Sequence, residues 1–440
     1  MTKWSLGYEI LRLFIRQNFR SFYKRIESIG NEYIPSGKPI IFAANHQNAL
    51  MDPLGILFTS KEQTVFLTRS DIFNNPILLK IFTFFKMLPV YRIRDGKEAL
   101  KNNERIFNTS VEILEAKMSV ALFPEATHND KRRLRIFKKA VPRIAFLAEE
   151  KNNYELDLQI VPVGIYYEEY THSNGKLFIN YGKPFTIKEY RSIYEDNDQK
   201  GFKALRERME AEIKPLIINQ PDLEHYDLYE GIRVFNRPNK LSKLNLKDNT
   251  LANCFKADKE TVNNLEEFYF NKGNDISDLD NKYSAFKQEC DKEKIKVIDS
   301  KPKPAFNIII NSLLFIIGLP IFIFAFINNY IYFKLIINFM NKIKDQQLHS
   351  SVKFALSLLV NFIAYPIHAA ILWAISGNGE WALIYLALLP LTALFANKYR
   401  YAYIDFMYEF RLWKFSKSNR FSNYLELKKS LNTVLEKAMV

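Results

Sequence analysis

A histidine and an aspartate stand six positions apart directly after an apolar run, and together they could remove a proton from a hydroxyl group. His46 and Asp52 both lie in the segment ANHQNALMDP. An imidazole takes up a proton near neutral pH, and a carboxylate on its other nitrogen fixes the tautomer and stabilises the imidazolium. No GxSxG-type nucleophile motif occurs, which favours direct attack of an acceptor's hydroxyl on a thioester over a covalent acyl-enzyme. The alternative is a purely structural histidine at the end of a strand.

A second apolar run, residues 120–123, ends in a carboxylate and is followed by a group of cations. A carboxylate at the end of a strand can accept a hydrogen bond from an acceptor's hydroxyl, and the cations can hold a phosphate. A bare basic run is otherwise usually a solvated face. We expect a phosphate-bearing acceptor to bind here, at Glu125, Thr127, Lys131 and Arg132.

Two further segments suit binding better than catalysis. Arg92 follows the run LPVY, and a guanidinium at that position can bind a phosphate through two parallel hydrogen bonds. Pro162 interrupts the apolar segment IVPVG, which favours a strand that lines an acyl slot or lies at the edge of a sheet. His368 lies inside an apolar run, where either a functional role or a hydrogen bond to a neighbouring helix would explain it.

The elements around these residues alternate between strand and helix patterns. Short β-rich runs are found at residues 39–44, 64–68, 120–123, 160–166 and 176–181, and helical stretches such as 97–118 and 138–150 separate them. This alternation predicts an α/β domain whose sheet is at least partly parallel. The carboxyl ends of parallel strands meet at one edge, so the active site is expected at that edge.

Composition and charge point to a membrane surface as the partner. Apolar residues make up 48% of the chain, aromatic residues make up 15%, and the formal net charge is +14. Charge alone does not separate a nucleic acid from an anionic membrane, but three long apolar runs follow one another at residues 306–333, 354–375 and 381–396. We therefore expect a phospholipid membrane, and no nucleic acid, as the partner. The two cysteines show no metal-ligand spacing, so neither a metal site nor a disulfide framework is expected.

These patterns divide the chain into five parts. Residues 1–28 are predicted to form a basic amphipathic helix on the membrane surface, 29–186 the catalytic domain and 187–304 a polar, mostly helical extension. Residues 305–397 are predicted to form a membrane region, and 398–440 a basic cytoplasmic tail. Within the membrane region we expect a re-entrant hairpin that turns near Gly318 and Pro320, followed by two spans. Short loops rich in lysine and arginine flank these runs, which predicts a catalytic domain on the cytoplasmic face of a multi-pass membrane protein.

Taken in chain order, the four segments that carry His46, Arg92, Glu125 and Pro162 resemble the four motifs of the glycerolipid acyltransferase family, which includes glycerol-3-phosphate and 1-acylglycerol-3-phosphate acyltransferases. The resemblance covers roughly residues 35–184. It implies an acyltransferase-like mixed sheet flanked by helices, with His46 and Asp52 as the catalytic pair. It further implies that Arg92 and Glu125 bind the acceptor and that Pro162 belongs to the strand near the acyl site.

The first motif departs from the usual spacing of this family, since five residues, not four, separate His46 from Asp52. This longer form resembles the fungal-type glycerol-3-phosphate and dihydroxyacetone-phosphate acyltransferases. In the third motif the common glycine is Ala126 and the common arginine is His128, which leaves Lys131 and Arg132 as substitutes for the phosphate-binding cation.

The resemblance implies transfer of a fatty acyl group to glycerol 3-phosphate or a related phosphate-bearing acceptor in phospholipid synthesis. The acyl donor would be acyl-CoA or acyl-carrier protein as a co-substrate, with no cofactor. Two alternatives remain, namely a 1-acylglycerol-3-phosphate or lyso-lipid O-acyltransferase, and a catalytically dead membrane scaffold that binds lipid.

Overall fold

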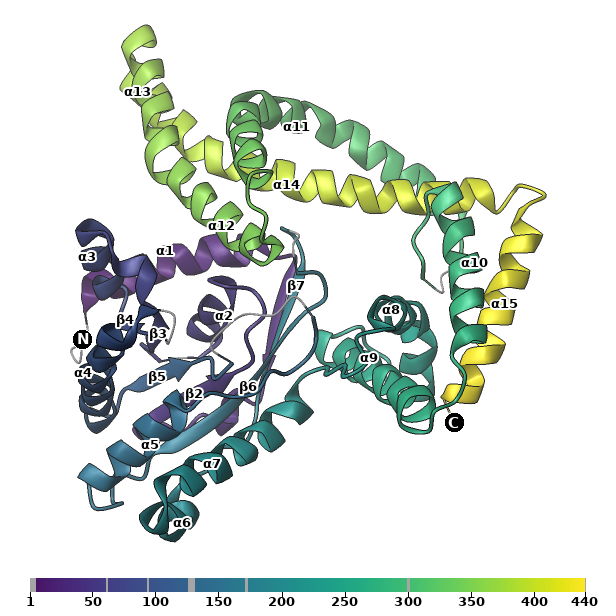
Figure 1. Ribbon diagram of the computed structural model, residues 1–440. Coiled ribbons are helices and arrows are strands. Elements are labelled where there is room, and N and C mark those ends of the chain that lie inside the picture. Colours follow the sequence, from purple (N-terminus) through teal and green to yellow (C-terminus); the bar gives the residue numbers. More distant parts are fainter. Residues whose placement is uncertain are drawn as a thin grey trace. The chain divides into compact units, whose positions relative to one another are not determined.

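The computed structural model describes residues 5–60, 62–92, 95–125, 131–170, 173–298 and 301–439. The chain forms two compact units. The first comprises Met1–Asn219 together with the short segment Asp345–Ser351, and the second comprises Gln220–Lys344 together with Val352–Val440. Figure 1 labels the elements of both units.

The first unit is built on a seven-stranded sheet with the strand order β1-β7-β6-β2-β5-β3-β4. The strands are β1 Arg25–Ile29, β2 Ile40–Ala44, β3 Val65–Arg69, β4 Met87–Val90, β5 Ser119–Leu122, β6 Gln159–Tyr167 and β7 Lys176–Tyr181. Among the described strands the pairings are parallel except for β6 with β7. The predicted mixed α/β sheet is therefore confirmed, and the carboxyl ends of β2 to β6 meet at one edge.

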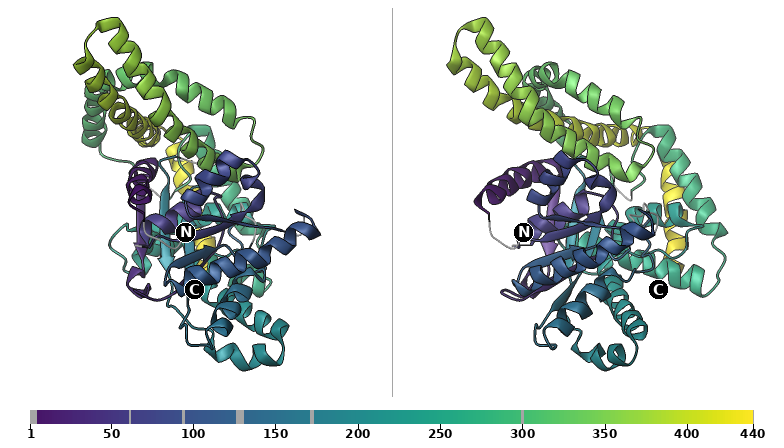
Figure 2. Two further views of the ribbon diagram at one scale, coloured as in Figure 1. Left: turned by 90° about the vertical axis from the view of Figure 1, so that its left-hand side faces the viewer. Right: turned by 60° about the vertical axis from the view of Figure 1, so that its left-hand side comes forward.

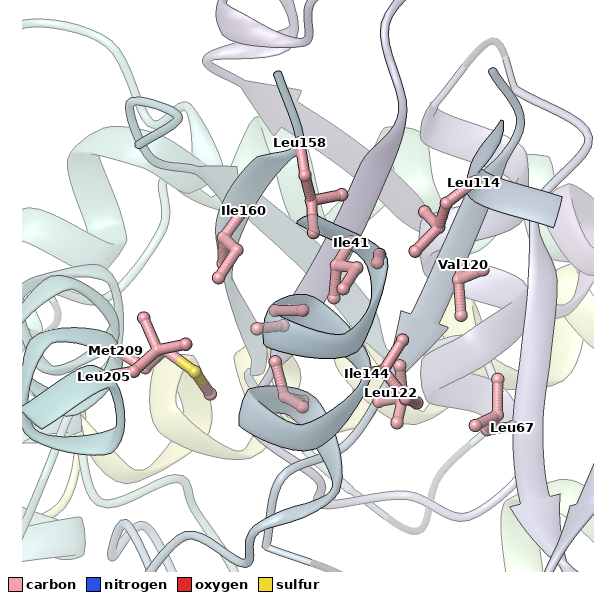
Figure 3. Close-up of a cluster of buried hydrophobic side chains, with 14 of the residues drawn as sticks. Ile41, Leu67, Leu114, Val120, Leu122, Ile144, Leu158, Ile160, Leu205 and Met209 are labelled. Atoms are coloured by element: carbon pink, nitrogen blue, oxygen red, sulfur yellow. The ribbon is translucent and has the colours of Figure 1, made fainter. Parts of the chain in front are cut away.

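One face of the sheet is covered by α4 Lys97–Glu115, α5 Ala140–Lys151 and α7 Asp198–Ile213. Alternate strand residues such as Ile41 point toward these helices and pack with Ile144 of α5 and Leu205 of α7 (Figure 3). Full burial of a side chain of this size contributes about 1.5–3 kcal/mol, so this layer is a main source of the unit's stability. The sequence analysis assigned residues from 187 onward to a solvated extension, but α7 packs into this core because Phe202, Leu205 and Met209 form an apolar stripe along it.

The opposite face of the sheet is covered by α1 Leu6–Phe22 and α2 Met51–Thr59. Phe19 of α1 lies against Phe58 of α2, with ring centroids 5.2 Å apart. The turned views in Figure 2 show α1, in purple, separated by the sheet from the blue and teal helices of the other face. α1 ends at Phe22, earlier than the expected limit of residue 28, because residues 25–29 pair with β7 as strand β1.

Two shorter helices complete the first unit, and four polar helices form one part of the second. The first unit also contains α3 Pro76–Phe84 and α6 Arg191–Asp196, and the second contains α8 Tyr226–Lys243, α9 Leu251–Leu265, α10 Ser277–Glu293 and α15 Phe421–Ala438. The first three residues of α12, from His349 to Ser351, also belong to the first unit. Phe286 of α10 and Tyr424 of α15 share a buried core, so the C-terminal residues are folded against the extension. Both cysteines are free and buried.

Three long apolar helices form the other part of the second unit. They are α11 Ala305–Met340, α12 His349–Leu359 continued by α13 Tyr365–Ser376, and α14 Gly379–Phe415. Each of the three is long and apolar enough to cross a membrane. Their polar side chains bond between helices, since the Tyr365 hydroxyl donates to Asn329 Oδ1 at 2.6 Å and the Tyr332 hydroxyl lies 2.6 Å from His368 Nε2. His368 thus has the helix-to-helix hydrogen bond that the sequence analysis gave as one explanation for it.

The expected hairpin at residues 306–333 is not seen. α11 continues as one helix through Gly318 and Pro320, where we had placed a turn. Proline removes one backbone donor from a helix, and neighbouring helices can compensate for this loss in apolar surroundings. Gly318 also packs closely on α14, because a Cβ atom there would lie 2.9 Å from the Tyr399 ring.

Candidate active site

His46 and Asp52 form a hydrogen-bonded pair at the carboxyl edge of the sheet. His46 lies just beyond β2, and its Nδ1 is 2.7 Å from Asp52 Oδ2. The His46 side chain keeps 16% of its surface exposed, whereas Asp52 is fully buried in the first turn of α2. The imidazole stacks on Phe123, with ring centroids 4.2 Å apart. A carboxylate at Nδ1 places the proton there, so the basic lone pair of the neutral imidazole is on Nε2.

The carboxylate of Asp52 is held by three further donors. The backbone N–H groups of Gln47 and Asn48 donate to Oδ2 at 2.7 and 2.8 Å, and the Tyr167 hydroxyl donates to Oδ1 at 2.7 Å. Tyr167 ends β6, the strand that pairs with β2, and it is completely buried. Burial and the nearby Asp52 charge hold the pKa of the Tyr167 hydroxyl well above its ordinary value, so it remains a donor. The sequence analysis did not identify Tyr167, and the only sequence signal for it is its position at a strand end.

The loop that connects β2 to α2 is fixed to the sheet by its first residue. The Asn45 side chain donates to the Ile165 carbonyl at 3.0 Å and accepts from the Ile165 N–H at 2.7 Å, so it extends the β2–β6 ladder beyond the end of β2. Farther along the loop, Ala49 has a φ of 34°. A non-glycine residue in the left-handed region costs about 1–3 kcal/mol and persists only where its surroundings enforce it. The turn that brings Asp52 under His46 is therefore a strained one.

Glu125 lies next to this pair, just beyond β5. The His46 backbone N–H donates to Glu125 Oε1 at 3.4 Å, and the carboxyl is 3% exposed. Burial raises the pKa of the Glu125 carboxyl to about 8, and the negative charge of Asp52 acts in the same direction. The His46 N–H and the cationic Arg135 partly offset this rise. At neutral pH Glu125 is thus largely protonated and able to donate as well as accept a hydrogen bond.

Arg132 supports the pair from inside the fold. Its guanidinium is 1% exposed and donates from Nη2 to the Tyr167 carbonyl at 2.7 Å. The same group lies over the rings of Tyr166 and Tyr170, 4.8 and 4.9 Å from their centroids. These contacts orient the end of β6, from which Tyr167 reaches Asp52. The expected contact of Arg132 with a phosphate remains a prediction.

The neighbouring predicted acceptor residues are only partly described. Lys131 is half-buried. Thr127 and His128 fall within residues 126–130, which lie outside the described residues. Their contributions to acceptor binding remain predictions.

Arg92 follows β4, at the same edge of the sheet as His46 and Glu125. Two strands, β5 and β3, lie between β2 and β4. The Arg92 side chain is 18% exposed, with Nη2 3.5 Å from Asp71 Oδ2 and Nε 4.0 Å from Asp95 Oδ2. These carboxylates orient the guanidinium at the margin of the site.

Pro162 lies in the interior of β6, opposite Ala43 of β2. It is buried, and its carbonyl accepts from the Gly182 N–H at 2.8 Å. The prediction of a proline in a strand is confirmed, but the strand is internal to the sheet, because β6 lies between β2 and β7. Pro162 has no N–H to donate, so its carbonyl makes its ladder hydrogen bond. A role for Pro162 near an acyl chain remains a prediction.

Among the described residues, no group of three or more histidine, cysteine, aspartate or glutamate side chains is placed to hold a metal ion. This edge of the sheet carries one imidazole with a buried carboxylate behind it, and beside it a carboxyl whose pKa burial raises to about 8. Such an arrangement can accept a proton from a hydroxyl and orient that hydroxyl for attack on a carbonyl.

Comparison with known proteins finds a matching family model and similar solved structures. Residues 25–166 match the family model described as Acyltransferase. The crystal structure of the 1-acyl-sn-glycerophosphate (LPA) acyltransferase PlsC from Thermotoga maritima is similar at 21% sequence identity, over 45% of this chain and 79% of that chain, with a TM-score of 0.33. No curated protein sequence matches the chain. The matched range contains His46, Asp52, Arg92, Glu125 and Pro162.

Proposed function

We propose that this chain, whose residues 25–166 match the acyltransferase family model, transfers a fatty acyl group from a thioester to a hydroxyl of glycerol 3-phosphate or a related phosphate-bearing acceptor. The donor in this proposal is acyl-CoA or acyl-carrier protein. The observation that carries the proposal is the 2.7 Å contact between His46 Nδ1 and the buried Asp52 carboxylate, with the imidazole still partly exposed.

In the proposed reaction His46 acts as general base. Nε2 takes the proton of the acceptor's hydroxyl as that oxygen attacks the thioester carbonyl carbon. A C–O bond forms, the C–S bond breaks, and the proton passes from the imidazolium to the leaving thiolate. Asp52 stabilises the imidazolium while it carries the proton, and general-base catalysis of this kind contributes about 10²- to 10⁴-fold to the rate.

Glu125 is proposed to orient the acceptor. Its carboxyl lies beside the His46 backbone and is largely protonated at neutral pH, since its pKa is raised to about 8 by burial. A neutral carboxyl can bond to a hydroxyl without repelling a phosphate dianion nearby. Arg92 and Lys131 are proposed to bind that phosphate, and Arg132 mainly to support Tyr167. The assembled pair is also the reason to favour an enzyme over a catalytically dead scaffold.

We further propose that the chain is a membrane protein with two crossings. Lys303, just before α11, pairs with Glu409 near the end of α14 at 2.6 Å, so the chain enters and leaves the apolar helices on one side. An even number of crossings must therefore separate these two points. At most two of the three candidate helices can then cross the membrane.

The connector Asp345–Ser351 supports the same count. It packs within the first unit, and the described residues before α11 contain no candidate crossing. In this proposal both ends of α11 lie on one side of the membrane, and α12–α13 and α14 are the two crossings. The loop between these two, residues 377–380, carries no positive charge, which favours a position away from the cytoplasm.

Acceptor-dependent thiol release tests the proposed function. The full chain would be purified in detergent or vesicles and given an acyl-CoA with glycerol 3-phosphate, dihydroxyacetone phosphate, 1-acylglycerol 3-phosphate or unphosphorylated glycerol. Acyl-carrier protein would replace CoA in a parallel series. The proposal predicts thiol release and a new ester only with phosphate-bearing acceptors. Release that needs no acceptor, or equal use of glycerol, would contradict it.

A further inference from the structure

The loop between His46 and Asp52 contacts a segment 301 residues away in the sequence. Leu50 donates its backbone N–H to the Ser351 hydroxyl at 3.0 Å. Ser350 donates from its own hydroxyl to the Tyr170 carbonyl at 2.7 Å, and that carbonyl also accepts from Asn48 Nδ2 at 2.9 Å. Ser350 and Ser351 are 1% and 6% exposed. The two serines therefore bind the loop and the strand end that surround the candidate catalytic pair.

The position of each bond gives it a structural consequence. Leu50 is the N-cap residue of α2, and its side chain makes no capping hydrogen bond. The Ser351 hydroxyl accepts the Leu50 N–H, directly after the strained Ala49 with its φ of 34°. A strained residue persists only when its neighbours over-determine it. Asn45 fixes the start of the loop to β6, Asn48 fixes its middle to Tyr170, and Ser351 fixes its end.

The loop also has one residue more between His46 and Asp52 than the motif that it resembles. The extra residue must be accommodated while the carboxylate still reaches Nδ1. The loop turns at Ala49, whose positive φ persists only where surrounding contacts enforce it. Serines 350 and 351 provide such contacts.

We propose that the first turn of α12 is a positioning element of the active site, in which Ser351 and Ser350 hold the loop so that Asp52 remains beneath His46. This inference rests on the proposed acyl transfer for its catalytic readout. α12 continues through α13 as an apolar helix, so the chain itself joins the conformation of the catalytic loop to a candidate membrane crossing. The position of this turn then determines how often Asp52 lies behind the His46 imidazole.

The consequence is a loss of rate without loss of substrate binding when the hydroxyl is removed. Neither serine contacts His46 or Asp52 in the described hydrogen bonds, so neither is a catalytic residue. A looser loop leaves Asp52 less often in place behind the imidazole. The expected result is a lower kcat at nearly unchanged KM for acceptor and thioester.

The test compares Ser351→Ala and Ser350→Ala with the conservative Ser351→Thr, all in the full chain. Ser357→Ala is the matched control, because the Ser357 hydroxyl bonds only within α12, to the Phe354 carbonyl at 2.7 Å among the described contacts. Hydrogen–deuterium exchange of the peptide that covers residues 46–52 is measured beside kcat and KM. Loss of one ordinary hydrogen bond predicts exchange about 2- to 10-fold faster in Ser351→Ala, with wild-type exchange in Ser357→Ala.

Recovery of both exchange protection and kcat in Ser351→Thr would support positioning by the hydroxyl. Wild-type exchange in both alanine variants would overturn the proposal, as would faster exchange with an unchanged kcat. The exchange comparison does not depend on turnover. If the wild-type chain transferred no acyl group, the proposed function would fail. The exchange data would still show whether the Ser351 hydroxyl holds the loop.

Discussion

Replacing Tyr167 with phenylalanine removes a single hydrogen bond from the candidate catalytic pair. The ring stays in its buried position at the end of β6, while the donor to Asp52 Oδ1, at 2.7 Å, and the contact of the hydroxyl with Tyr23 are lost. Hydrogen bonds to charged groups contribute about 1.5–3 kcal/mol, so we expect the free energy of unfolding to fall by about that amount. The other three donors to Asp52, all on Oδ2, remain.

The same change should lower the rate of the reaction. With one donor fewer, the Asp52 carboxylate is held less firmly behind the imidazole, and kcat/KM should fall by about 3- to 30-fold. Thiol release measured in Tyr167→Phe and wild type would show this loss.

Tyr181→Phe is a control for loss of a buried hydroxyl. The Tyr181 hydroxyl is also buried in the sheet but lies 2.7 Å from the Thr59 hydroxyl, a neutral partner. Its loss should cost about 0.5–1.5 kcal/mol of stability and leave kcat/KM unchanged. The reasoning would be refuted if Tyr167→Phe kept the wild-type kcat/KM, or if both variants lowered it equally.

Three further predictions concern charge and topology. Because burial raises the Glu125 pKa from an ordinary 4.5 to about 8, its favourable contribution is complete below pH 4.5 and is lost as pH rises to about 8. The free energy of unfolding of Glu125→Gln should therefore exceed that of wild type by a difference that grows with pH across this window, to about 4–5 kcal/mol at its upper end. A difference that stays constant across pH would contradict this prediction. Arg92→Ala should raise the KM for the phosphate-bearing acceptor about 10- to 100-fold while the KM for the thioester stays unchanged, and an equal rise in both would exclude a phosphate role. The topology is tested in a variant without the two native cysteines. A cysteine placed at Asn378 should react with an impermeant thiol reagent from outside intact cells, whereas one placed at Gln346 should react only after permeabilisation. Labelling of the Gln346 position from outside would show that α11 crosses the membrane.

The sequence predicted those features of the site that are local in the chain. His46 and Asp52 are six positions apart, and the strand before them follows from an apolar run. The alternating runs likewise predicted five of the described strands, at nearly their observed bounds. β1 and β4 were missed because RIESI and MLPV are short and show no clear alternation of polar and apolar residues.

Contacts between distant residues could not be predicted from the sequence. Tyr167 and Ser351 lie 115 and 301 residues from their partners in the loop, and no spacing pattern links them to it. Arg132 was assigned to a phosphate because it belongs to a basic run, whereas in the fold its guanidinium lies against tyrosine rings. The hairpin near Pro320 was wrongly expected because proline lowers helix propensity, and the helices that compensate are not visible in the local sequence.

The most direct test of the central claim compares His46→Ala with His225→Ala in acceptor-dependent thiol release from an acyl-CoA. Both histidines contact an aspartate through Nδ1, His46 at 2.7 Å and His225 at 2.8 Å from Asp222, but His225 lies in the second unit and outside the matched family range. General-base catalysis by His46 predicts a loss of about 10²- to 10⁴-fold in His46→Ala and wild-type turnover in His225→Ala, with both proteins folded. Turnover near the wild-type rate in His46→Ala would contradict the account.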